Sequence, residues 1–445
     1  AVEWYSTKYS DVANNASKAY SVFAPSDVAM NNFFDNYWEK GGYESLDDVD
    51  DLAMKYMLNQ FIYEDGIAFP DEITSGKVKN MYDMVFNFDP SKVTDKSMCV
   101  NGVFYGLNTI DTPILFASVV GPAFRNKDCN YYLYMLDGTG LITAYSSQDT
   151  KYVLLVPTNE QIESEDIYLR TYADGSRLQQ ETEDGLVDVS SSVMRTIVNI
   201  HTATGVDGLK TNGTQVLATQ TGFNYWYVKD GKITSSAAYN QILEPDNNVE
   251  PFSEFTEVKN GNDNWNNGRT YMYSGTALFQ AQEGDGLQHK LSVCNDNRYV
   301  YYQFAQLLQK AGMVMSSNYI FGLAGASHVI GFIPTNEAII TAIAAGQIPG
   351  MDVTGAVTSS LQLRQYLLSY FIRDRENALI SYPYPGSAMK SSTYVTASGK
   401  SLAYTDSGSS LSIMVDGKVA NVISDYNFFP FAFDDGCFQL IDAVL

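Results

Sequence analysis

A strand–proline–cap–helix pattern occurs three times in this sequence, and this repetition constrains the fold more than any other feature. The clearest copy is residues 328–339, where an apolar run reaches Pro334 and is followed by Thr335. Because proline fixes φ and lacks an N–H, it ends a β-ladder. The Thr335 hydroxyl can then accept from an N–H of the first helical turn, and Glu337 lies at the positive end of the helix dipole.

The other two copies lie upstream, at residues 20–29 around Pro25 and at residues 152–161 around Pro157. In the second of these, Thr158 stands three residues before a glutamine, which fits a capping box. Self-similarity at intervals of domain length indicates several copies of one structural unit. We therefore predict that each of the three prolines ends a buried strand and leads into a capped helix.

These segments resemble the first signature of fasciclin-like domains. They read VFAPSDVA at 22–29, LLVPTNEQ at 154–161 and FIPTNEAI at 332–339. The family's second landmark, a helix ending in an apolar-Asn-aromatic run, resembles residues 57–62, 197–202 and 367–372. The third landmark, a closing strand, resembles 435–445 closely and 101–110 with Asn108 in place of an aspartate, whereas 273–279 matches poorly. The landmarks follow the same order in each copy and together cover nearly the whole chain.

The resemblance implies an α+β fold of tandem fasciclin-like domains, each a small β-sandwich or wedge with packed helices. We expect the domains at residues 1–110, 111–283 and 284–445. Residues 299–311 supply an amphipathic front helix in the third copy, but residues 1–19 are too polar to supply it in the first. Either the sequence begins inside the first domain or this copy is abbreviated. The second copy carries an acidic insertion at 163–188 and a long segment at 244–269 that we expect to be irregular.

Charge and composition exclude several classes of function. The chain has 28 basic and 51 acidic residues, a net charge of −23, so nucleic acid and anionic membrane surfaces are repelled. No stretch approaches the roughly 18–20 apolar residues of a membrane-spanning helix, so we expect membrane attachment only through an anchor upstream of Ala1. The four cysteines lack the spacing of zinc or redox motifs, and we expect Cys99 and Cys437 to be buried thiols.

The sequence offers no catalytic constellation. Its three histidines fall in different predicted elements, and zinc-protease, nucleophile-elbow and phosphate-loop motifs are absent. The acidic clusters lack the spacing of a calcium loop. We therefore expect no catalytic residues, no metal and no cofactor, and a protein that is not an enzyme. A hydrolase remains an alternative, but it needs a converging site that the sequence does not reveal.

Two sets of residues are candidates for binding. In fasciclin-like domains the second helix and the closing Ile-Asp have been connected with adhesion, and this resemblance carries over only to His201, Tyr370 and Asp442. The favoured alternative is that the helix only packs its aromatic side chain against the sandwich.

The second set consists of aromatic residues in predicted loops. Trp265 stands beside Asp263 in an Asn/Gly-rich run, and Tyr382 and Tyr384 alternate with prolines. Aromatic side chains on loops are common contact anchors for proteins and sugars. Either loop can instead pack against its neighbouring domain.

The sequence therefore predicts a non-catalytic binding or adhesion protein exported to a bacterial outer-membrane surface. The low cysteine content favours a bacterial over an animal extracellular origin. The expected partners are a surface protein or a glycan, and the chain is a candidate accessory subunit of an outer-membrane assembly such as a transporter complex. The alternative is a glycan-binding surface lipoprotein that assists nutrient uptake.

Overall fold

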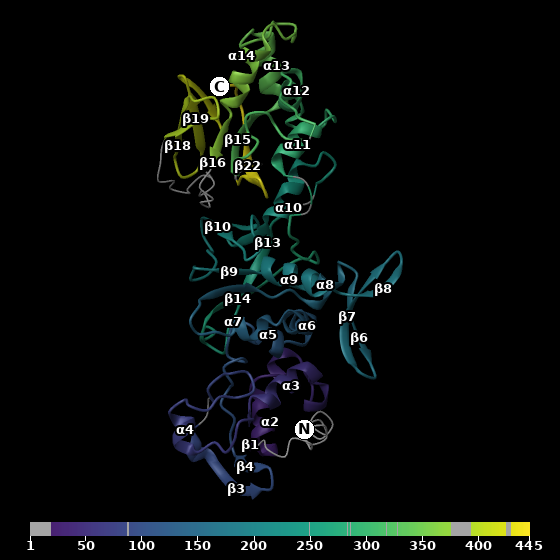
Figure 1. Ribbon diagram of the computed structural model, residues 1–445, viewed down its shortest axis with the longest axis vertical. Coiled ribbons are helices and arrows are strands. Elements are labelled where there is room, and N and C mark those ends of the chain that lie inside the picture. Colours follow the sequence, from purple (N-terminus) through teal and green to yellow (C-terminus); the bar gives the residue numbers. More distant parts are fainter. Residues whose placement is uncertain are drawn as a thin grey trace. The chain divides into compact units, whose positions relative to one another are not determined.

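The protein forms two compact α+β units in its computed structural model (Figure 1). The structure describes residues 19–86, 89–248, 250–282, 284, 286–316, 318–326, 328–374, 393–423 and 429–445. The first unit contains the described residues up to Gly208 together with Phe255–Leu278. The second unit contains Leu209–Glu254 and Phe279–Leu445. The predicted fold class, α+β, is confirmed.

One four-stranded arrangement occurs three times. In the first copy, β1 (Tyr20–Pro25) lies parallel to β4 (Gly102–Leu107), with β2 (Ile62–Tyr63) antiparallel to β1 on its other side. Strand β3 (Val93–Cys99) pairs antiparallel with β4 and completes the order β2-β1-β4-β3. Strand β1 is only half-buried, less than the sequence predicts.

The second and third copies have the same order of strands. In the second, β5 pairs with β9 and β14, and β13 lies beyond β14; the bounds are β5 Tyr152–Leu155, β9 Thr202–Thr204, β13 Ser253–Val258 and β14 Gly268–Tyr273. In the third, β15 pairs with β16 and β22, and β21 lies beyond β22; the bounds are β15 His328–Pro334, β16 Phe371–Asp374, β21 Phe431–Phe433 and β22 Gly436–Ile441. In each copy the proline-ended segment is parallel to the closing strand.

A glycine opens the closing strand in every copy, and its role is the same each time. Gly102, Gly268 and Gly436 have φ values of 152°, 152° and 153°, which side chains rarely adopt. A Cβ atom at these positions would lie 1.9, 1.9 and 2.0 Å from the carbonyl oxygens of Tyr20, Tyr152 and Val329. The glycine therefore allows the closing strand to approach the start of the proline-ended strand.

The predicted caps are confirmed in all three copies. The hydroxyls of Ser26, Thr158 and Thr335 accept from the N–H groups of the third residue that follows each of them, and Thr158 forms the capping box. They begin helices α2 (Asp27–Asn36), α8 (Asn159–Glu163) and α13 (Asn336–Ala344). The second-landmark helices are α3 (Asp51–Asn59), α9 (Ser191–Ile200) and α14 (Ser360–Leu368). Each leads into the short strand that flanks the proline-ended strand.

The closing strand of the second copy lies upstream of its predicted position. It is β14, which follows Asn267, and not residues 273–279. Much of the segment 244–269 is also ordered, because it contains β13 and the start of β14, and β13 pairs antiparallel with residues 270–273 of β14. The prediction of an irregular loop is therefore wrong there. Asn267-Gly268 is the Asn-Gly signal that the closing strand requires.

The first unit has one core that includes side chains of both its repeats. Trp38 Nε1 donates to Phe124 O at 3.1 Å, and the Tyr37 hydroxyl lies 2.9 Å from Phe116 O. The remaining helices of this unit are η2 Glu39–Gly41, η3 Leu46–Asp48, α4 Pro70–Thr74, η4 Pro90–Lys92, α5 Gly121–Arg125, η5 Lys127–Cys129, α6 Asn130–Thr139 and α7 Leu141–Tyr145. The acidic insertion of the sequence forms a separate sheet, β6 (Ile167–Tyr172), β7 (Gly175–Thr182) and β8 (Gly185–Asp188).

The second unit contains the third copy and a segment that is inserted between β9 and β14 of the second copy. This segment, residues 209–254, is here called the excursion. Tyr227 stacks on Phe429 with ring centroids 4.7 Å apart, and its hydroxyl donates to Pro430 O at 2.7 Å. Asn240 Nδ2 donates to Ala432 O at 2.8 Å. The excursion is therefore part of the core of this unit.

The excursion and the C-terminal part of the unit contain further short elements. They are β10 Thr214–Ala218, β11 Tyr225–Lys229, β12 Lys232–Ser235, α10 Ser236–Asn240, η6 Gln241–Leu243, α11 Leu287–Val293, α12 Tyr302–Lys310, β17 Thr393–Val395, β18 Ser401–Asp406, β19 Leu411–Val415 and β20 Lys418–Asn421. Asp230-Gly231 and Asp416-Gly417 form hairpin turns, since both aspartates and their glycines have positive φ. None of the described helices is long and apolar enough to cross a membrane.

Candidate functional site

Trp265, the first predicted contact anchor, is buried, and its predicted exposure is wrong. The side chain is 3% exposed, and its Nε1 donates to Val258 O at 2.7 Å. The ring fills the space beside Gly121, where a Cβ would lie 2.3 Å from it, and Arg125 lies over its face. Trp265 thus fixes the turn between β13 and β14. Asp263, on the same turn, is exposed, but no exposed Trp265 ring lies beside it as predicted.

The residues carried over from the family landmarks contribute to packing and strand pairing. Tyr370 is fully buried, and its hydroxyl accepts from the N–H of Leu445 at 2.9 Å. Asp442 is exposed and accepts from the backbone and side chain of Asn421 at 2.7 and 3.0 Å, which fastens β20 to the end of β22. Tyr382 and Tyr384 lie outside the described residues.

His201 is a neutral, structural histidine. Its Nδ1 lies 2.7 Å from Ile197 O and must donate to that carbonyl, so Nε2 accepts from the Tyr273 hydroxyl at 3.0 Å. Burial lowers the pKa of His201 to about 4. His201 belongs to the first unit and Tyr370 and Asp442 to the second, so these residues do not form one site within either unit.

Groups that could perform metal or thiol chemistry are not gathered in the described part of the chain. No cluster of three or more His, Cys, Asp or Glu side chains there is placed to hold a metal ion. Cys437 is buried as predicted, but Cys99 is exposed on the edge strand β3, so that prediction is wrong. Burial raises the pKa of Cys437, which makes its thiol a packing group.

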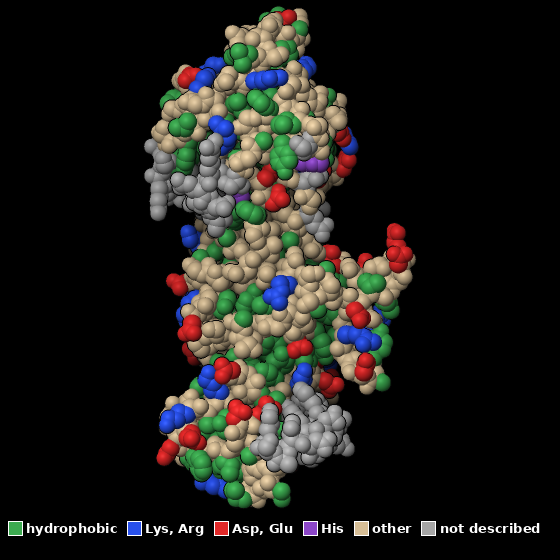
Figure 2. Space-filling view, in the orientation of Figure 1, with side chains coloured by type: hydrophobic (Ala, Val, Ile, Leu, Met, Phe, Trp, Pro, Cys, Tyr) green, Lys and Arg blue, Asp and Glu red, His purple; other side chains and the backbone are tan. Residues whose placement is uncertain are grey.

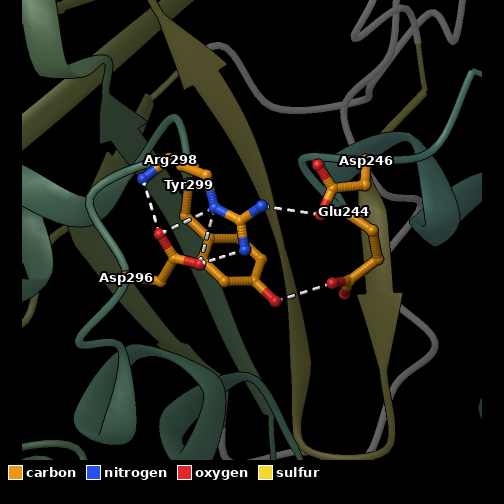
Figure 3. Close-up of polar contacts among 5 residues, drawn as sticks. All are labelled: Glu244, Asp246, Asp296, Arg298 and Tyr299. Carbon is orange, nitrogen blue, oxygen red and sulfur yellow. Dashed lines mark hydrogen bonds and ion pairs between the residues drawn. The ribbon is translucent and has the colours of Figure 1, made fainter.

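A charged network in the second unit fastens two loops together (Figure 3). Glu244, after η6, accepts from Lys290 Nζ at 3.0 Å and from the Tyr299 hydroxyl at 2.6 Å. Arg298 binds Asp246 and Asp296 at 2.6 and 2.7 Å.

These contacts also explain the titration of the network. Burial opposes ionisation of Glu244, but the hydrogen bonds from Tyr299 and Lys290 outweigh it and lower the pKa of that carboxyl. The bond to Glu244 raises the pKa of Tyr299 to about 12. Because Glu244 and Asp246 on one loop bond to Tyr299 and Arg298 on the other, the network acts as a fastening between loops.

A hollow beside Gln60 and Asn80 is too small to be a ligand pocket. Its interior volume of about 10 Å³ is room for about one water molecule. The two buried amides that line it bond to each other at 3.0 Å. This hollow is therefore a packing feature.

The sheet β6–β8 presents a different kind of surface. Figure 1 shows it standing out to the side of α8. Its inner face packs on the first unit through Ile167 and Leu178, which belong to the core of that unit. The register of the strands places eight side chains on the other face, here called the outer face: Tyr168, Arg170, Tyr172, Arg177, Gln179, Glu181, Leu186 and Asp188. Acidic and basic side chains lie beside one another on this sheet (Figure 2).

Polar contacts fix the outer face. The Tyr172 hydroxyl donates to Gln179 Oε1 at 2.6 Å, and Gln179 Nε2 donates to Asp188 at 2.7 Å. The Arg177 guanidinium lies 4.2 Å from the centre of the Tyr172 ring, and Arg170 lies 5.4 Å from the Tyr168 ring. The side chains therefore hold one another in place before any ligand arrives.

The sequence carried a signal for this sheet that its acidic composition concealed. Asp174-Gly175 and Asp184-Gly185 stand at the two hairpin turns, and both glycines have positive φ. Between them, the register of the strands places Arg177, Gln179 and Glu181 on one face and Leu178 and Gln180 on the other. The count of eight acidic residues in segment 163–188 by itself gave no indication of these two turns.

The comparisons with known proteins add little to this geometry. No family model matches the sequence, and no curated protein matches it. Among solved structures, one match is a FAS1 domain pair from the insect cell adhesion molecule fasciclin I, at 13% identity and a TM-score of 0.28. The match covers 71% of this chain and 95% of that one. A TM-score of 0.28 is too low to establish a shared fold.

Proposed function

We propose that the chain consists of three fasciclin-like repeats and works as a non-catalytic binding protein of the adhesion type. The sequence landmarks support the family, and the order of strands repeated three times supports the count of repeats. The boundaries 1–110, 111–283 and 284–445 remain a prediction for these repeats. In this proposal the landmarks that the copies share build the fold, and the segments that differ between the copies bind the partner.

The outer face of β6–β8 is the observation that carries the proposal. Residues 37–50 and 345–359, which join the corresponding helices in the first and third copies, hold no sheet, whereas residues 164–190 hold β6, β7 and β8. Tyrosine and arginine are the residues most often found as energetic centres of binding sites. An ordered face of this kind on an insertion supports a role in binding.

The cellular location and the partners that we propose rest on the sequence alone. We propose that the protein is exported to a bacterial outer-membrane surface and contacts a surface protein or glycan, as an accessory subunit of a surface assembly. The acidic charge of −23 accords with a partner that is not a nucleic acid. A second candidate, a glycan-binding surface lipoprotein that assists nutrient uptake, is favoured by the mixture of rings, amide and carboxylates on the outer face.

Binding of the labelled full chain to intact bacterial cells tests the proposal. Tyr172→Ala should weaken saturable binding by about tenfold, which corresponds to about 1.4 kcal/mol. The matched control is Tyr319→Ala, because Tyr319 is a similarly exposed tyrosine in the other unit, 48% against 39%, and it should bind within about twofold of the wild type. Absence of saturable binding, or equal loss in both variants, would contradict the proposal.

A further inference from the structure

We propose that the outer face of β6–β8 binds a neutral glycan. This inference rests on the proposed binding function and names the chemical class of its ligand. A sugar ring offers C–H groups on its faces and hydroxyls around its rim, so it needs apolar rings beside fixed donors and acceptors. The outer face supplies both kinds of group on one side of a single sheet.

The aromatic part is provided by two tyrosines on one strand. Tyr168 and Tyr172 point to the same side of β6, with Arg170 between them. Tyr172 is 39% exposed although Arg177 lies over its ring. Tyrosine buries a large area at low cost in conformational entropy, so an exposed ring already held by neighbours is suited to stacking.

The polar part is held rigidly by the relay from Tyr172 through Gln179 to Asp188. The Gln179 side chain is only 9% exposed, and its oxygen and nitrogen are both engaged. Asp188 retains carboxylate lone pairs, and Arg177 retains N–H donors, for a ligand. Since these groups are ordered in advance, a bound sugar loses less free energy to side-chain ordering.

The charges on the face favour a neutral ligand over an anionic one. Arg170 pairs with Glu181, and Arg177 pairs with Asp174 and Asp188 at 3.4 and 3.7 Å. The two guanidinium groups of the outer face are thus balanced by its two carboxylates, Glu181 and Asp188, and acidic groups are in excess on the chain as a whole. A sulfated or carboxylated glycan would have to displace these pairs against that field.

The same charges disfavour a protein partner as the main occupant. The centres of protein interfaces are depleted of aspartate and glutamate, and covering an ion pair with apolar surface costs desolvation energy. Leu186 is the one aliphatic side chain among the eight on the outer face. Hydroxyl groups, in contrast, can replace the water on Arg177, Glu181 and Asp188 without leaving a charge unsatisfied.

The test uses the full chain and immobilised probes: neutral polysaccharides of glucose, mannose and galactose, heparin as an anionic glycan, and a basic protein. We expect binding to at least one neutral polysaccharide that changes less than about twofold between 0.05 and 0.5 M NaCl, because no ionic contact is formed. Tyr172→Ala should reduce this binding by about tenfold. Tyr172→Phe keeps the ring but breaks the relay and should bind with intermediate affinity, whereas Tyr319→Ala should bind like the wild type.

The melting temperature of each variant shows whether it is folded. Should Tyr172→Ala fail to fold, Arg177→Lys, which keeps the charge but loses the planar guanidinium, must show the loss of affinity. Binding to heparin or to the basic protein alone, with strong dependence on salt, would overturn the glycan inference while leaving the proposed binding function intact. Failure of every probe together with absence of binding to cells would overturn both.

Discussion

At the scale of single residues, the positions that the family resemblance connects with adhesion are occupied in making the fold. His201 and Tyr370 are fully buried, and Asp442 holds a strand. The cap at Thr335 was predictable because its partner lies three residues away. The burial of Trp265 was not, because it depends on Gly121, which is distant in sequence and leaves space only by having no side chain.

His201 makes stability depend on pH in a defined window. Its pKa is lowered to about 4 in the folded protein, from an ordinary value of 6.5. Between these values the unfolded chain binds a proton that the native state does not, so the free energy of unfolding falls as pH is lowered. The loss should reach about 3 kcal/mol near pH 4. Urea unfolding from pH 7 to pH 4 measures it.

The control for this effect is His201→Gln, which does not titrate. Its stability at pH 7 should be reduced because the bonds to Ile197 and Tyr273 change. However, its slope against pH between 6.5 and 4 should be smaller than that of the wild type. Equal slopes in the two proteins would show that His201 is not the group responsible.

At the scale of elements, local signals were sufficient where a strand ends in proline and a helix begins with a cap. The predicted cap forms in all three copies, although β1 is only half-buried. The predictions were wrong or incomplete where they rested on composition and not on turn residues. This applies to the β6–β8 sheet, described only as an acidic insertion, and to β13, predicted as irregular. The sequence also provided no sign that residues 209–254 pack against the third copy, since that depends on contacts such as Tyr227 with Phe429, far apart in the chain.

Tyr227 tests whether this excursion stabilises the third copy. Removing its fully buried ring by Tyr227→Ala should cost about 3–5 kcal/mol. Tyr227→Phe keeps the stacking but leaves Pro430 O without its donor and should cost about 1 kcal/mol. Hydrogen exchange of the β15 and β22 amides is the measurement. Lys232→Ala, at an exposed position of β12, is the control, and protection unchanged by Tyr227→Ala would rule out the coupling.

At the scale of the whole molecule, the three repeats do not correspond one to one with the two compact units. Two repeats share the core of the first unit, and the third shares the core of the second with the excursion. The sequence predicted the repeats because each carries its landmarks locally. It did not predict the units, because a core depends on which apolar faces meet.

The central claim is that one strand arrangement is built three times, and the three glycines test it most directly. Gly102→Ala, Gly268→Ala and Gly436→Ala should each cost about 3 kcal/mol or more, because each Cβ would meet a carbonyl oxygen across the strand pair. The matched controls Gly66→Ala, Gly261→Ala and Gly399→Ala have positive φ but open space around the Cβ and should cost about 1–2 kcal/mol.

Thermal unfolding of the six variants is the measurement. For units of this size, the three strand glycines should lower the melting temperature of the unit that contains them by about 6–12 °C, clearly more than their controls. A strand glycine that tolerates alanine as well as its control does would contradict the equivalence of the three copies.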